Sequence, residues 1–213
     1  HSVSDSDYGE YFGFTDQEVR ELLSYYEMEE LYLVVKEWYD GYQFGKEEIY
    51  CPWDVLNYIR EHIGDRNVPP KLYWINTSGN EIVKKLIRRA DSGMKDEIEQ
   101  LIEGKSITKE IHMEMTYKDL DDPREGEADT KKENLWSILY TTGYLTSKTP
   151  SSDGRHYNLE IPNKEIWAIF VMQVREWMSE TVIYGNTDRL LNFCQAVKMG
   201  EADKFQELFN EYL

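Results

Sequence analysis

The sequence predicts a mainly α fold, with a helical bundle followed by a winged-helix-like module that contains a small β-hairpin sheet. Several segments carry apolar residues at helical spacing, and two short alternating runs follow a helix near residue 135. Hydrophobic residues make up 40% of the 213 residues, enough for one large domain or two small ones with a real core. The apolar runs are short and interrupted, so we expect no membrane span.

The chain is strongly acidic, with a formal net charge of −17. Such a chain repels polyphosphates, so any contact with nucleic acid has to come from a local basic patch. Its two cysteines, Cys51 and Cys194, imply no framework of disulfides. Together with the lack of a signal-peptide pattern, this predicts a reducing, cytoplasmic location.

Helical signals fill the first half of the chain. Thr15 and Glu18 have the spacing of a capping box, and Pro52 suits the first turn of a helix. The aromatic segment 39–53 contains two glycines and is expected to be a loop. Helices are predicted over residues 15–26, 28–39, 53–63, 79–90 and 94–103.

The second half carries the predicted hairpin. An apolar helix over 134–142 stops at Gly143, and the alternating runs 144–146 and 157–161 flank a polar turn. A strand is predicted over 107–115 and an acidic loop over 121–132. A single helical turn at 117–120 and helices over 163–180, 187–199 and 203–213 complete the expected order.

The sequence predicts no catalytic residues and no metal site. Gly104-Lys105-Ser106 copies the end of a phosphate-binding loop, but position 99 is Glu where that motif needs glycine. Glu103 and Lys105 copy the end of a nuclease motif without a partner carboxylate on a neighbouring strand. The four histidines have no ligand spacing with each other or with cysteine.

Four basic residues share one region of the predicted helix 79–90. Their i, i+4 spacing places Lys84 over Arg88 and Lys85 over Arg89. Either they form a solvated face, or they contact phosphate of a nucleotide or nucleic acid. The predicted winged helix offers few other cations, so a nucleic-acid-binding module is the alternative function rather than the first.

Six ordered motifs between residues 12 and 165 resemble one family. They are FGFTxxEV from Phe12, KEWYDGYxF from Lys36, IYxPW from Ile49, YWxNTSGN from Tyr73, LxxTGYLT from Leu139 and IPNKE from Ile161. Together they resemble the bacterial AAA-ATPase-like family, whose members often carry a C-terminal PD-(D/E)XK nuclease-like domain. Where that family usually has Asn and Ser, this chain has Cys51 and Asp54.

The resemblance implies a non-catalytic part of a larger ATPase. Walker motifs are expected before the FGFT segment and nuclease-like carboxylates after this chain, so ATP and Mg²⁺ belong to the ATPase part. The implied subdomains are a helical lid-like bundle (1–104), a winged-helix-like module (105–186) and closing helices (187–213).

A regulatory or protein-docking role follows from that placement. The expected partners are the chain's own ATPase and nuclease-like domains, with a protein substrate or nucleic acid as further possibilities and no membrane. Two polar turns are candidates to face the nucleotide domain or a partner, although glycine turns and an aromatic core explain them equally well. The candidate residues are Tyr39, Asp40, Gly41, Tyr42, Asn76, Thr77, Ser78 and Asn80.

Overall fold

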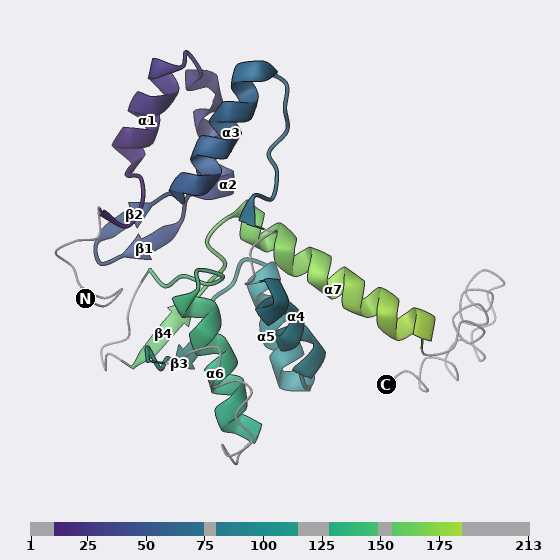
Figure 1. The fold of residues 1–213 in the computed structure, drawn as a ribbon. Helices are drawn as coiled ribbons and strands as arrows, with labels where there is room; N and C mark the ends of the chain where they lie inside the picture. The colour runs from purple at the N-terminus through teal and green to yellow at the C-terminus, as the bar shows by residue number, and fades with distance from the viewer. Residues whose placement is uncertain (1–10, 75–79, 115–127, 149–154, 185–213) are drawn as a thin grey trace. The chain divides into compact units, whose positions relative to one another are not determined.

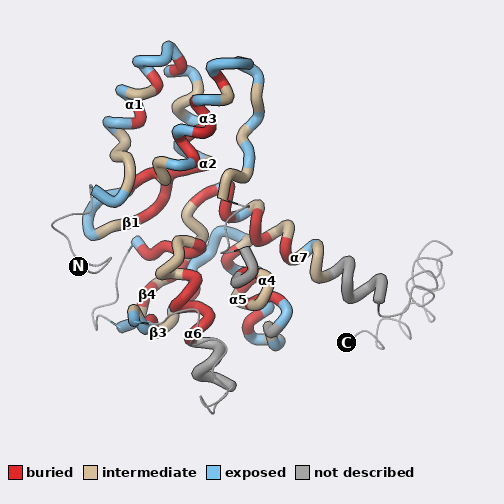
Figure 2. The backbone as a smooth tube through the Cα atoms, viewed as in Figure 1, coloured by how far each residue is buried: buried red, intermediate tan, exposed pale blue. Residues whose placement is uncertain are grey.

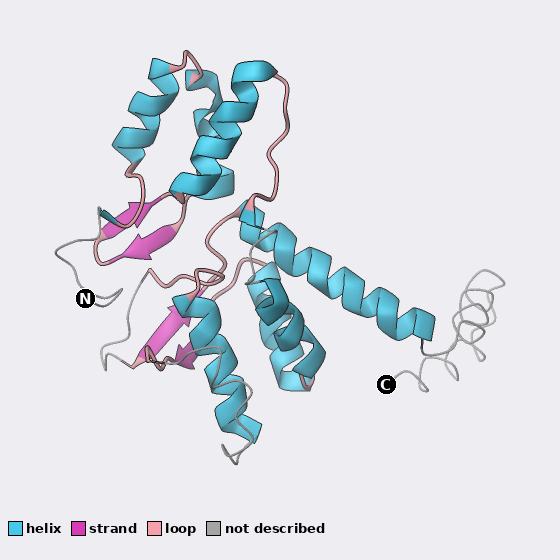
Figure 3. Cartoon of the chain, in the orientation of Figure 1, coloured by secondary structure: helices cyan, strands magenta, loops and turns pink. Residues whose placement is uncertain are grey.

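The computed structural model describes residues 11–74, 80–114, 128–148 and 155–184 (Figure 1). The chain divides into two compact units, residues 1–171 and 172–213, with the boundary inside the last described helix. The predicted mainly α class is confirmed: over the described ranges, helices dominate and the strands form two small antiparallel sheets (Figure 3). None of the described helices is both long and apolar enough to cross a membrane.

The first part of unit 1 is built from short helices. They are α1 (Asp16–Tyr25), the 3-10 helix η2 (Glu29–Leu31), α2 (Tyr32–Tyr39) and α3 (Pro52–Gly64). The predicted capping box is confirmed: the Glu18 backbone N–H donates to Thr15 Oγ1 at 3.3 Å, and Thr15 N–H donates to Glu18 Oε2 at 2.8 Å. The single helix expected over 28–39 instead begins with the 3-10 turn.

Helix α1 ends with a left-handed residue that is not glycine. Glu27 has φ 54°, and the backbone N–H groups of Glu27 and Met28 donate to the carbonyls of Ser24 and Leu23. This is the hydrogen-bond pattern of a Schellman motif, in which the left-handed position strongly prefers glycine. A side chain there costs about 1–2 kcal/mol.

Replacing Glu27 by glycine is therefore expected to stabilise the protein by about 1 kcal/mol. Urea unfolding should show a higher midpoint with an unchanged slope. The matched control is Glu21→Gly in the interior of α1, which is expected to destabilise by about 1 kcal/mol. A lower midpoint for Glu27→Gly would contradict the strain argument.

The aromatic segment predicted as a loop contains a β-hairpin, so that prediction was wrong there. Strands β1 (Tyr42–Phe44) and β2 (Glu47–Ile49) pair antiparallel, with Phe44 opposite Glu47. The two-residue turn starts with Gly45 at φ 59°, the positive φ that such tight hairpins require. Adjacent glutamates in β2 hid the alternation that indicates a strand.

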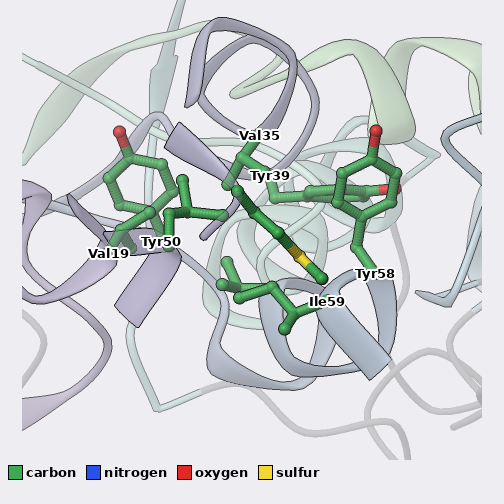
Figure 4. Close-up of a cluster of buried hydrophobic side chains, with 9 residues drawn as sticks. Val19, Val35, Tyr39, Tyr50, Tyr58 and Ile59 are labelled. Carbon is green, nitrogen blue, oxygen red and sulfur yellow. The ribbon is translucent and has the colours of Figure 1, made fainter. Parts of the chain in front are cut away.

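A core of aliphatic and tyrosine side chains holds these elements together. Figure 4 shows Tyr39 and Tyr58 side by side, with ring centroids 5.6 Å apart. Both residues are at most 2% exposed, so their rings contribute the large apolar burial that stabilises a small bundle. The cluster consists of Val19, Leu23, Met28, Val35, Tyr39, Tyr50, Val55, Tyr58 and Ile59.

The second part of unit 1 combines helices with the other sheet. Its described elements are α4 (Asn80–Arg89), α5 (Ser92–Ile102), β3 (Ile107–Glu110), α6 (Ala128–Thr141), β4 (His156–Leu159) and, up to residue 171, the start of α7 (Lys164–Tyr184). Helices α5 and α6 end in Schellman motifs with Gly104 at φ 80° and Gly143 at φ 82°. Gly104 and Lys105 thus close a helix, and Lys105 Nζ pairs with Glu103 Oε2 at 2.6 Å.

Three predictions for this part need correction. The strand expected over 107–115 ends at Glu110, and it pairs with β4. The run 144–146 contributes one bridge, Thr146 to Glu160, because β4 takes β3 as its partner in the sheet. Helix α6 begins at Ala128, so residues 128–132 of the expected acidic loop are helical; this segment contains alanine and two lysines, which are good helix formers.

Some predictions fall outside the described residues. These are the turn at 117–120, the polar turn between the two alternating runs, and the closing helices 187–199 and 203–213. The subdomain boundaries at 104 and 186 stay predictions.

Candidate functional site: a buried carboxyl pair

Two helices of unit 1 begin at a shared pair of carboxyl groups. Asp54 lies in the first turn of α3, which Pro52 opens, and Glu165 lies in the first turn of α7. Asn163 caps α7, because its Oδ1 accepts from the backbone N–H of Ile166 at 3.0 Å. Each carboxyl is thus near a helix N-terminus, where the macrodipole favours negative charge.

The two carboxyl groups are fully buried and lie close to each other. Asp54 and Glu165 are both 0% exposed, and each is near enough to shift the pKa of the other. Glu165 Oε1 also accepts from the Trp74 backbone N–H at 2.6 Å. Neither oxygen of Asp54 accepts from an N–H group among the described residues. Two ionised carboxylates this close together and away from water repel each other, so we expect the pair to hold one proton.

Burial and the neighbouring charge both favour that proton. Burial and then the proximity of Asp54 raise the pKa of Glu165 to about 9. Burial also raises the pKa of Asp54, although its proximity to the side chains of Cys51 and Glu165 acts in the opposite direction. The Cys51 thiol lies beside Asp54, and burial raises its pKa as well, which keeps it protonated and poorly nucleophilic. The pair therefore titrates as a unit and carries one proton at neutral pH.

The carboxyl pair is part of a longer contact, here called the seam, which joins segments 39–44, 54 and 74 to segments 143–146 and 160–165. Asn163 Nδ2 donates to the Asp40 carbonyl at 2.9 Å, and the Gln43 N–H donates to Thr146 Oγ1 at 3.0 Å. At its tightest point, a Cβ on Gly41 would lie 2.0 Å from the Pro162 carbonyl oxygen. Only glycine allows the two backbones to approach this closely.

A third buried carboxyl group, that of Asp40, lies within the seam. Asp40 is 4% exposed, and its Oδ2 lies 3.4 Å from Lys36 Nζ. Burial raises the pKa of Asp40, while a backbone hydrogen bond from Gly41 and the charge of Lys36 act in the opposite direction. Asp40 therefore adds negative charge within the seam without belonging to the carboxyl pair.

The structure brings one of the two predicted turns into the seam. Tyr39, Asp40, Gly41 and Tyr42 are all buried, and they face other parts of unit 1. The Tyr39 hydroxyl donates to the Lys71 carbonyl at 3.2 Å. These contacts give the turn a structural role, and its orientation toward a nucleotide domain or partner stays a prediction. Asn76, Thr77 and Ser78 lie outside the described residues, as does the side chain of Asn80.

The predicted basic group lies on α4, away from the carboxyl pair in the sequence. Lys84 and Lys85 are half-buried, Arg88 is exposed, and each of the three already has an interaction partner. The side chain of Arg89 is outside the described part. In the predicted wing, Lys148 Nζ lies 3.5 Å from Glu160 Oε1.

Sequence reasoning missed Asp54, Asn163 and Glu165 as a group. Asp54 and Glu165 each look like an ordinary acidic residue in the first turn of a helix, which is their common position. One signal was present in the sequence. Asp54, like Cys51, differs from the residue that is usual at its position in the family that the motifs resemble. Nothing in the sequence links that departure to Glu165 on a distant helix.

The chemistry that the Asp54–Glu165 pair supports directly is the binding and release of a proton. Over the ranges that the structure covers, no group of three or more His, Cys, Asp or Glu side chains could hold a metal ion. Comparison with protein-family models, curated proteins and solved structures finds no match to this chain.

Proposed function

We propose that this chain is the non-catalytic lid and winged-helix part of an AAA-ATPase-like protein, with a regulatory or protein-docking role. One observation carries the proposal beyond the resemblance itself. Segments of four of the six motifs meet at the seam, through Gly41 with Pro162, Trp74 with Glu165 and Gln43 with Thr146. The motifs thus mark a joint between two parts of the chain.

A joint of this kind suits regulation. The seam combines hydrogen bonds between distant segments, a close backbone contact and a buried carboxyl pair that favours one proton. Small changes in such an interface shift the balance between discrete arrangements of the parts that it joins. We place the protein in the cytoplasm, where its partners are its own ATPase and nuclease-like domains and, for docking, a protein substrate. ATP and Mg²⁺ bind to the ATPase domain in this proposal.

The test is ATP hydrolysis by the complete native polypeptide. We expect that protein to contain Walker motifs ahead of Phe12 and to hydrolyse ATP with Mg²⁺, while residues 1–213 alone do not. Gly41→Ala should change the hydrolysis rate of the complete protein, whereas Gly104→Ala, away from the seam, should leave it near the wild-type value. A native polypeptide without Walker motifs, or hydrolysis by residues 1–213 alone, would refute the proposal.

A winged helix that binds nucleic acid is the alternative function. If the chain is instead a lid and docking part, we expect it not to bind nucleic acid. Fluorescence anisotropy with short single- and double-stranded DNA and RNA should show no micromolar binding by the chain, even at low salt. The net charge of −17 and the existing partners of Lys84, Lys85 and Arg88 are the reasons. Tight binding that weakens steeply with salt and disappears in Lys84→Glu/Arg88→Glu would favour the alternative.

A further inference from the structure

Helix α3 is apolar on two opposite faces. Its inner face contributes Val55 and Ile59 to the core, as Figure 2 shows by the buried positions along the helix. Its outer face exposes Trp53 (61%), Leu56 (48%) and Ile63 (61%). The outer face of a surface helix is ordinarily polar, so a second apolar face indicates a contact beyond those that the described residues make.

The exposed positions have the spacing of a helix–helix contact. Trp53, Leu56, Arg60 and Ile63, here called the outer stripe, follow each other at intervals of three, four and three residues. That is the heptad spacing with which one α-helix packs along another. The outer stripe extends for about 15 Å, two to three helical turns of contact.

A positive charge sits inside the apolar stripe and is held in place. Arg60 Nη2 donates to Asn57 Oδ1 at 2.6 Å, and Asn57 Nδ2 donates to the Trp53 carbonyl at 2.7 Å. Arg60 is exposed, and the neighbouring carboxylate of Glu61 is already paired with Lys71 Nζ at 2.7 Å. Covering the stripe would bury the guanidinium, which is costly unless a carboxylate pairs with it.

We propose that the outer stripe binds a partner helix that has apolar residues at heptad positions and a carboxylate opposite Arg60. Trp and Arg are the residue types that most often dominate binding energy in protein interfaces. A second copy of this chain fits poorly, because its own stripe presents Arg60 instead of a carboxylate and it adds a further charge of −17. The inference is independent of the ATPase-related proposal.

Selection from a peptide display library tests this directly. The probe is a library of helix-forming peptides of about 20 residues, randomised along one face and selected on the 213-residue chain. We expect enriched peptides with apolar residues at heptad spacing and Asp or Glu at one central position. Trp53→Ser should weaken their binding at least about tenfold, while Leu33→Ser, at an equally exposed apolar position on α2, should not.

A charge exchange then tests the geometry at Arg60. Arg60→Glu should weaken the selected peptides, and replacing their central acid by Lys should restore binding. All these residues are exposed, so the variants should keep the wild-type circular dichroism. Peptides without a shared acid, equal binding to Trp53→Ser, or no rescue by the exchanged charges would overturn the proposal. So would a dimer in sedimentation velocity that Trp53→Ser dissociates, because the occupant would then be a second copy.

Discussion

Replacing Gly41 by alanine is expected to destabilise the protein by about 3 kcal/mol. Gly41 has φ 93°, and a left-handed conformation costs a side chain about 1–2 kcal/mol. The new Cβ would also lie 2.0 Å from the Pro162 carbonyl oxygen and 2.9 Å from its carbon, so the seam would have to open. Overpacking against atoms that cannot rotate away typically costs a further 1–3 kcal/mol, roughly.

The variant Gly104→Ala separates the cost of the left-handed conformation from the cost of the contact with Pro162. Gly104 has φ 80°, and a Cβ there would meet no atom within 4 Å. This variant should lose only the cost of the left-handed conformation, about 1 kcal/mol. Urea unfolding of both variants gives the difference between them, which measures the contact with Pro162. Equal losses would show that the seam does not hold Gly41 tightly.

Replacing Glu165 by glutamine is expected to make the protein more stable than wild type at alkaline pH. The pKa of Glu165 is raised from an ordinary value of 4.5 to about 9 in the folded protein. Folding therefore takes up a proton in this window, and wild-type stability is full below about pH 4.5 and falls as the pH rises towards 9. One proton corresponds to a slope of about 1.4 kcal/mol per pH unit at most.

Glutamine mimics the protonated acid without titrating. Its oxygen can accept from the Trp74 N–H, and its amide can donate to Asp54. The free energy of unfolding, measured in urea from pH 5 to 9, should fall less steeply for Glu165→Gln than for wild type. The control is Glu99→Gln, at an exposed position on α5, which should keep the wild-type slope. Parallel curves for Glu165→Gln and wild type would show that the pair holds no proton at neutral pH.

Local patterns predicted most of the described helices but not their long-range contacts. Capping residues, the proline at the start of α3 and helical apolar spacing act within a few residues, so α1, α3, α4 and α5 were found within two residues or so of their ends. The β1–β2 hairpin was missed because Glu47 and Glu48 break the alternation that usually identifies a strand. The pairing of β4 with β3 was missed because strand order depends on contacts between distant segments.

The carboxyl pair is a clearer example of a long-range contact that local sequence patterns do not predict. Asp54 and Glu165 each satisfy a local rule by themselves, as acidic residues near a helix N-terminus. Their burial and the raised pKa of Glu165 depend on contacts between distant segments, such as that of Gly41 with Pro162. The glycine turn was singled out from the sequence, but its contact partner, Pro162, is in a segment of the chain that no local pattern connects to it.

The distance between Asp54 and Glu165 along the chain also bears on synthesis by the ribosome. The core cluster from Val19 to Ile59 is complete early, because all of its members lie in the first third of the sequence. Asp54 lacks its partner until the segment that contains Pro162 and Glu165 has been made. Until then the Asp54 carboxyl can stay hydrated and ionised. The carboxyl pair therefore binds its proton only after the segment with Glu165 has been synthesised and has packed against Asp54.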